Sequence, residues 1–218
     1  MNIIETIKIR KSTRTFNPNS LNPLDKSCLE IFLQSNCMGL NNQKIDLSII
    51  EKKNLTKLMK LDYGIIKGHN SYILGLTKAD SDSRVNYGYL VEKAVLKATE
   101  MNLASCWVGY FDPEYFDEFE IQNGFEIPSI VIIGYPDSNS TVMSKLLRFS
   151  AKSSKRASWD LLFFDYETNL PLNIHNKYND SLEMLRLAPS SGNTQPWRVF
   201  YDNIKEEFHF YKKVISKK

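Results

Sequence analysis

Apolar side chains recur at three- and four-residue steps in three stretches of the first half of the chain. The clearest stretch predicts one long, closely packed helix over residues 86–102, with Tyr87, Leu90, Val91, Ala94, Val95, Ala98 and Met101 on one face. Shorter stretches predict helices over residues 2–9 and 23–34. In the second of these we expect inward-facing Leu24, Cys28, Leu29, Ile31 and Phe32.

A different pattern predicts strands. The run IPSIVIIGYP, residues 127–136, is almost continuously apolar and ends in Gly134 and Pro136. This pattern is typical of a strand buried on both faces. DLSII and SYILGLT predict two more strands, and a short acidic helix is expected over residues 113–120.

The last third of the chain mixes both patterns. Residues 137–158 are polar and Ser-rich, which predicts a long connection, and residues 161–173 read as irregular. A helix is expected to begin near Asp180, with Glu183 completing a capping box, and to end before Pro189. WRVFYD and EEFHFYKK then predict a hairpin. The fold class is therefore α+β or α/β.

Composition narrows the function classes. The 218 residues are 42% apolar and 24% charged with a net charge of +3, values typical of a soluble globular protein. The cations form no sustained stripe, which argues against nucleic-acid binding. Three cysteines without C-x-x-C spacing favour a reducing cytoplasm, and three isolated histidines indicate no metal site. We expect a cytoplasmic protein with no signal peptide and no membrane span.

Two stretches could bind a ligand. IRKSTRTF places Arg10, Lys11, Ser12 and Arg14 within five residues, a set that suits a phosphate or another electron-rich acceptor. An exposed basic turn explains the same residues. LAPSSGNTQPW carries Pro189, Ser190, Ser191 and Asn193 in a stiff, polar loop that could hold a polar ligand, and a helix cap followed by a turn fits it equally well.

Cys106, in SCWVGYFD, is a less convincing candidate. No histidine lies in a recognisable partner motif, and its neighbours are apolar. A buried, inert thiol is therefore the better interpretation of this cysteine.

Together these motifs resemble the nitroreductase family of flavin enzymes. The matching stretches are IRKSTRTF, LASCWVG at the end of the long helix, IVIIGYP, KSSKR and, most specifically, APSSGNTQPW. The resemblance implies an α+β, three-layer fold in which helices flank a central, mostly antiparallel sheet. It also implies FMN as cofactor, NAD(P)H as electron donor and a small-molecule electron acceptor.

The order of the motifs is unusual for that family, whose serine loop ordinarily follows the first pair of helices. Here LQSNCMGLNNQKI occupies that place, and the loop comes near residue 190. This order resembles two family units fused in one chain: residues 1–155 form a nearly complete unit, and residues 156–218 form a partial second unit that supplies the loop and a short hairpin.

The resemblance assigns roles to residues. Arg10 and Ser12, within the basic group that includes Lys11, would hold the flavin phosphate, and Arg14 would lie toward the pyrimidine edge. Trp107, Val108 and Gly109 would approach the reactive side of the ring. Lys155 and Arg156 would add a phosphate contact, and the loop residues Pro189, Ser190, Ser191 and Asn193 would contact the flavin from the other half. No residue is expected to be catalytic, because the flavin carries the chemistry.

Three functions remain open from the sequence. The leading one is an FMN-dependent oxidoreductase that passes electrons from NAD(P)H to a nitroaromatic, a quinone or another small acceptor. The alternatives are a flavin-binding protein with little or no turnover, because the second unit is incomplete, and a basic interaction module without a cofactor. The short second unit would leave apolar surface uncovered, so we also expect self-association, with a homodimer as the simplest form.

Overall fold

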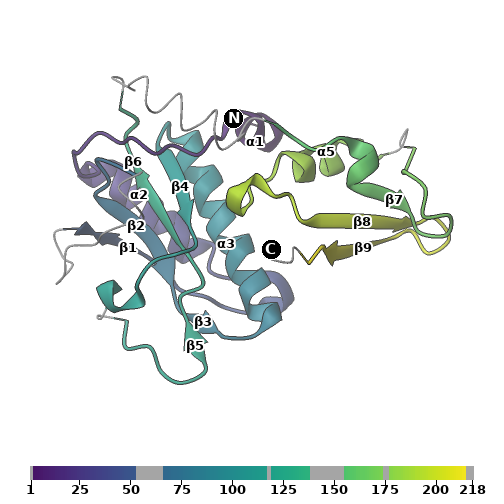
Figure 1. Ribbon diagram of the computed structural model, residues 1–218. Coiled ribbons are helices and arrows are strands. Elements are labelled where there is room, and N and C mark those ends of the chain that lie inside the picture. Colours follow the sequence, from purple (N-terminus) through teal and green to yellow (C-terminus); the bar gives the residue numbers. More distant parts are fainter. Residues whose placement is uncertain (1, 53–65, 117–118, 138–154, 174–176, 215–218) are drawn as a thin grey trace. The chain divides into compact units, whose positions relative to one another are not determined.

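A computed structural model describes residues 2–52, 66–116, 119–137, 155–173 and 177–214 (Figure 1). By their contacts the residues cluster into two compact units, one of Met1 with Ile9–Ser140 and one of Asn2–Lys8 with Thr141–Lys218. Residues 2–8, which the sequence analysis placed in the first unit, thus group with the second. Among the described residues, no helix combines the length and the apolar character needed to cross a membrane.

The first unit is built on a four-stranded sheet in the order β1-β2-β6-β4, with every neighbouring pair antiparallel (Figure 1). Its strands are β1 (Leu47–Glu51), β2 (Ser71–Gly75), β4 (Ala104–Val108) and β6 (Ile130–Gly134). Two short strands, β3 (Thr77–Lys78) and β5 (Phe125–Glu126), pair separately. The predicted α+β class with a central antiparallel sheet is confirmed.

Two helices, α2 (Pro23–Ser35) and α3 (Ser81–Glu100), pack on one face of this sheet. The stripe of α3 is buried as predicted, from Tyr87 to Ala98, and Met101 is partly buried beside it. Side chains alternate between the faces of a strand, so Ile73, Val131 and Ile133 all reach the helices.

The other face of the sheet forms a second core. Tyr72, Leu74, Ile130 and Ile132 point there and pack with residues outside the sheet, among them Phe16. All five residues of β6 are buried, which confirms the prediction of a strand covered on both sides.

Three details of the first unit differ from the sequence predictions. Helix α3 begins at Ser81 rather than near residue 86, because the Asp80 side chain accepts a hydrogen bond from the Ser83 amide and caps the helix. In α2, Leu24 is 74% and Ile31 60% exposed, and Cys28 is exposed as well, so these three residues do not face the core as predicted. The expected helix over residues 113–120 is a short 3-10 turn, Pro113–Phe116, with residues 117–118 outside the described part.

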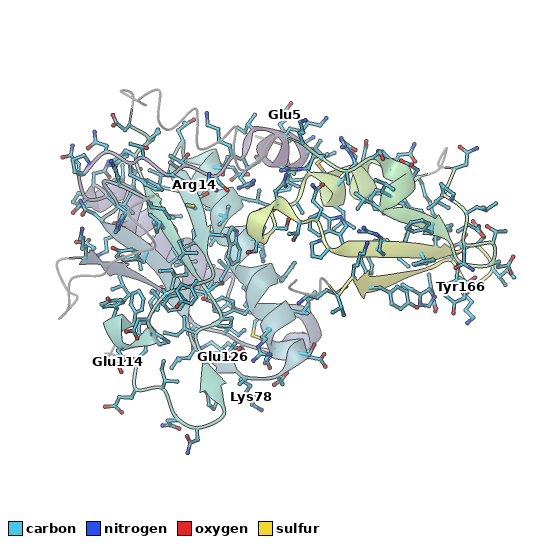
Figure 2. All side chains as sticks on the ribbon, in the orientation of Figure 1. Glu5, Arg14, Lys78, Glu114, Glu126 and Tyr166 are labelled. Carbon is cyan, nitrogen blue, oxygen red and sulfur yellow. The ribbon has the colours of Figure 1, made fainter. Side chains whose placement is uncertain are left out.

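The second unit holds a three-stranded sheet and a helix. Strand β8 (Trp197–Asp202) pairs antiparallel with β9 (Glu207–Lys212), as the predicted hairpin, and parallel with β7 (Phe163–Asp165). Helix α5 (Asn179–Leu187) packs on one face through Leu182, against a core with Leu162, Phe163 and Val199. Aromatic rings stack on the other face, including Tyr166 on His209 (Figure 2). Helix α1 (Ile3–Ile9) was predicted over residues 2–9. Its residues up to and including Lys8 cluster with the second unit.

Two predictions failed in the second unit. Residues 161–173 were expected to be irregular, yet they contain β7, whose parallel partner lies far along the chain. The capping box at Asp180 does not form, because the helix starts one residue earlier and Tyr178, at its N-cap, makes no side-chain cap bond. Glu183 instead accepts two 2.7 Å hydrogen bonds from Arg186.

Gly68 is a position where a side chain cannot be added freely. Its φ is +73°, and a Cβ there would collide with the backbone carbonyl of Phe16. We expect Gly68→Ala to lower the free energy of unfolding by roughly 1–3 kcal/mol. Gly88 in α3 has open space around it, so Gly88→Ala should raise the same quantity by about 0.5–1 kcal/mol. Urea unfolding of both variants measures the difference, and an equal response at the two sites would contradict it.

His69 makes the stability of the first unit depend on pH. Burial, with the positive charge of Lys52 as a lesser cause, lowers the pKa of His69 to about 4, and its Nδ1 lies 2.8 Å from the Tyr72 hydroxyl. Unfolding restores a pKa of about 6.5. Between these values the unfolded chain binds more protons, so the free energy of unfolding falls as pH falls, by up to about 1.4 kcal/mol per pH unit.

His69→Gln removes this titration while keeping a polar side chain. We expect the free energy of unfolding of the variant to decline less steeply than that of the wild type between pH 6.5 and pH 4. Urea titrations at several pH values measure both slopes. Identical slopes would show that His69 does not contribute to the dependence.

Candidate functional site

The basic segment, residues 10–17, is fixed by backbone hydrogen bonds along one edge of the first unit's sheet. The Thr13 amide donates to the Ser105 carbonyl at 2.9 Å, at the start of β4. The Phe16 amide donates to Lys67 and the Lys67 amide donates to Arg14, both at 2.9 Å. Arg14, labelled in Figure 2, therefore has a set position on a backbone that is tied on both sides.

Phe16 and Asn17 extend this attachment to the residues that follow β6. The Asn17 amide donates to the carbonyl of Tyr135, directly after β6, at 2.9 Å, and Phe16 forms a bridge with Pro136. The register of β4 with β6 pairs Ala104, the first residue of β4, with Gly134, the last residue of β6. The attachments at Ser105 and Tyr135 therefore lie at the same end of these two strands. The segment thus crosses the start of β4 and the end of β6.

Arg10 and Trp107, both predicted to contact the flavin, are connected through Glu92 of α3. The Trp107 Nε1 donates to Glu92 Oε2 at 2.8 Å, and Arg10 Nε lies 4.0 Å from Glu92 Oε1. The Arg10 side chain is 7% exposed. Burial raises the pKa of the Glu92 carboxyl, while the Arg10 charge and the Trp107 bond act against that rise. Sequence reasoning missed Glu92, because neither partner is near it in the chain.

The other predicted flavin contacts of the first unit lie in the basic segment or at the end of β4. Lys11 is exposed and Ser12 half-buried, and Ser12 bridges to Ser105. Val108 is buried at the end of β4, and Gly109 follows it with open space where a Cβ would point.

Cys106 is buried in β4. Burial raises the pKa of its thiol, with the charges of Arg14 and Arg10 acting in the opposite direction. A thiol with a raised pKa stays protonated and is a poor nucleophile, as the sequence analysis expected for this residue.

In the second unit the structure brings Lys155 and Arg156, the described end of the KSSKR motif, together with the serine loop, residues 188–196. Arg156 Nη1 donates to Asn193 Oδ1 and its Nη2 to the carbonyl of Leu187, both at 3.1 Å. Asn193 Nδ2 returns a bond of 2.9 Å to the carbonyl of Lys155. Three sequence-predicted residues, the adjacent Lys155 and Arg156 and the distant Asn193, therefore belong to one hydrogen-bonded cluster.

Gln195 belongs to the polar loop found in the sequence but was not among the predicted cofactor contacts. It is 8% exposed, and its Oε1 accepts from the Ala157 amide at 2.8 Å. Its own amide donates to Ser190 Oγ at 2.9 Å. The letters QPW drew attention to the loop, but they could not reveal that the glutamine side chain forms hydrogen bonds with residues 155 and 157. Pro189 and Ser190 are half-buried and Ser191 is exposed.

The described residues contain no group of three or more His, Cys, Asp or Glu side chains placed to hold a metal ion. The cations of the basic segment and the polar atoms of the serine loop are the features that stand out chemically. A guanidinium pair with a nearby hydroxyl suits a phosphate group.

Comparison with known proteins places the chain in a family. Residues 2–217 match a family model described as "Putative TM nitroreductase". Among solved structures, the chain resembles a protein from Thermotoga maritima described as "a putative nitroreductase", with 25% identity, a TM-score of 0.61, and coverage of 93% of this chain and 73% of that one. None of the curated proteins compared with the chain matches it.

Two further structures show the same fold. A nitroreductase family protein from Clostridium difficile has 22% identity, a TM-score of 0.57, and coverage of 77% of this chain and 99% of that one. A nitroreductase from Bacteroides fragilis, solved with bound FMN, has 16% identity, a TM-score of 0.51, and coverage of 65% and 92%. With the family model spanning nearly the whole sequence, the chain belongs to the nitroreductase family of oxidoreductases.

Proposed function

We propose that the protein is an FMN-dependent oxidoreductase that takes electrons from NAD(P)H and delivers them to a small acceptor such as a nitroaromatic or a quinone. The observation that carries the proposal is the basic segment, which places Arg10, Ser12 and Arg14 on a backbone attached to the edge of the sheet. Bound FMN in the Bacteroides fragilis relative supports the choice of cofactor.

The residues of the segment fit the phosphate of FMN. The Arg10 side chain is almost fully buried, and Ser12, which carries a hydroxyl, lies two positions along the chain. Charge-assisted hydrogen bonds of a guanidinium to a phosphate are short and strong. The nearby Glu92 holds Arg10 by attraction at 4.0 Å.

When bound, FMN would supply the electron transfer, and the chain's task is to hold it and to stabilise charge. Arg14 would place a fixed positive charge toward the flavin, which favours a more negative, reduced ring. Trp107, held by Glu92, would keep the end of β4 and Gly109 in position. The buried Cys106 thiol has no part in this scheme.

We further propose that the serine loop of the second unit contributes to the same cofactor site, with Ser190 and Ser191 as its contacts. Support comes from the family membership and from the fixed geometry of the loop. The fused-unit origin of the chain and its self-association as a homodimer stay predictions, the second of which sedimentation equilibrium can test.

Anaerobic stopped-flow mixing tests the function. We expect the yellow absorption of FMN bound to the purified protein to bleach on mixing with NADH or NADPH and to return when a quinone is added. A flavin that binds but stays oxidised with both nicotinamides would contradict the oxidoreductase and favour the flavin-binding protein without turnover. A chain that binds no flavin at all would contradict both.

A further inference from the structure

Arg156 is placed at the centre of a hydrogen-bonded cluster within the second unit. Its Nη1 donates to the Asn193 side chain and its Nη2 to the carbonyl of Leu187, each at 3.1 Å. Leu187 is the last residue of α5, where backbone carbonyls lack partners inside the helix and the helix dipole favours a cation. One guanidinium thus joins the end of α5 to the serine loop.

The backbone of residues 155–157 makes further hydrogen bonds with the side chains of Asn193 and Gln195. The carbonyl of Lys155 accepts from Asn193 Nδ2 at 2.9 Å and from Gln195 Nε2 at 3.3 Å. The Ala157 amide donates to Gln195 Oε1 at 2.8 Å. Residues 155–157 and the serine loop therefore exchange donors and acceptors in both directions.

The backbone of the loop needs such support. Gly192, Asn193 and Gln195 have φ values of 58°, 54° and 46°, in the left-handed region that side-chain-bearing residues avoid. Two of the three are not glycine. Conformations of this kind persist where surrounding contacts determine them, and they cluster at ligand sites.

We infer that Arg156 is a positioning residue: with Asn193 and Gln195 it clamps the serine loop into its ligand-ready shape, rather than contacting the flavin phosphate itself. Both amide ends of Asn193 take part in the clamp, so the contacts that the loop offers outward come from exposed neighbours such as Ser191. The part of this inference that concerns flavin rests on the proposed function; the part that concerns the loop's shape does not.

Titrations of the flavin-free protein with FMN and with riboflavin, which lacks the phosphate, separate the two roles. If Arg156 positions the loop, Arg156→Ala weakens binding of both flavins by a similar factor, about tenfold. Arg156→Lys has nearly the same effect, because an ammonium group cannot reproduce the forked geometry that reaches Asn193 and Leu187 together.

A direct phosphate contact gives the opposite pattern. Arg156→Ala would then weaken FMN but not riboflavin, and Arg156→Lys would largely restore FMN binding, since lysine serves phosphate well as a point charge. Arg84→Ala is the matched control: Arg84 also makes a two-bond pair, with Glu126, but lies in the first unit. It should leave both affinities unchanged.

Hydrogen exchange of the flavin-free protein provides a readout that does not depend on the proposed function. Peptides covering residues 188–196 should exchange faster in both Arg156 variants than in the wild type. In Arg84→Ala their exchange rate should equal that of the wild type. Should Arg156→Ala not fold, Arg156→Lys alone carries the comparison. Equal exchange rates in wild type and Arg156 variants would overturn the clamp. If the wild type binds neither flavin, the proposed function is overturned, and the exchange rates alone decide whether the clamp exists.

Discussion

The attachment of residues 13–17 to the edge of the antiparallel sheet is the constraint on which the first unit's candidate site depends. A backbone amide that leaves water must find a partner. Here the amides of Thr13, Phe16 and Asn17 find theirs in carbonyls of Ser105, Lys67 and Tyr135. These bonds fix the register of the segment, and the register decides where the side chains of Arg10 and Arg14 can reach. The cations owe their placement to main-chain pairing, and Gly68 allows the close approach to Phe16 that the pairing needs.

The second unit solves a related problem with side chains. The serine loop lacks large apolar side chains, so it buries too little apolar surface to hold a shape by packing alone. Arg156, Asn193 and Gln195 replace that missing core with directional hydrogen bonds. In both units, the segments whose polar residues suggest a ligand site also form hydrogen bonds that hold the local structure.

The sequence predicted those parts of the fold in which apolar residues follow a clear pattern over one continuous stretch. Helix α3, the doubly buried β6 and the β8–β9 hairpin all followed from spacing, and α+β was the right class. The start of α3 was missed, because one capping side chain, Asp80, extends the helix beyond its apolar stripe. Strand β7 was missed, because its three residues gain their structure from a parallel partner far along the chain.

The same division holds for the candidate site. Family motifs identified Arg10, Arg14, Arg156 and the serine loop, since each is a local string of letters. Glu92 was not found, and the partners of Gln195 were not foreseen, because both depend on contacts that only the folded chain supplies. The family itself is shown by the match over residues 2–217, while the fused-repeat interpretation remains a prediction from motif order.

Binding of FMN to Arg10→Ala tests the central claim most directly. Flavin-free wild type and variant can be titrated with FMN and followed by quenching of flavin fluorescence. The account predicts one FMN per wild-type chain and an affinity lower by roughly ten- to a hundredfold in the variant, through loss of a charge-assisted hydrogen bond to the phosphate. Equal affinities in the two proteins would contradict it, and would leave the basic segment as a structural edge of the sheet rather than a cofactor site.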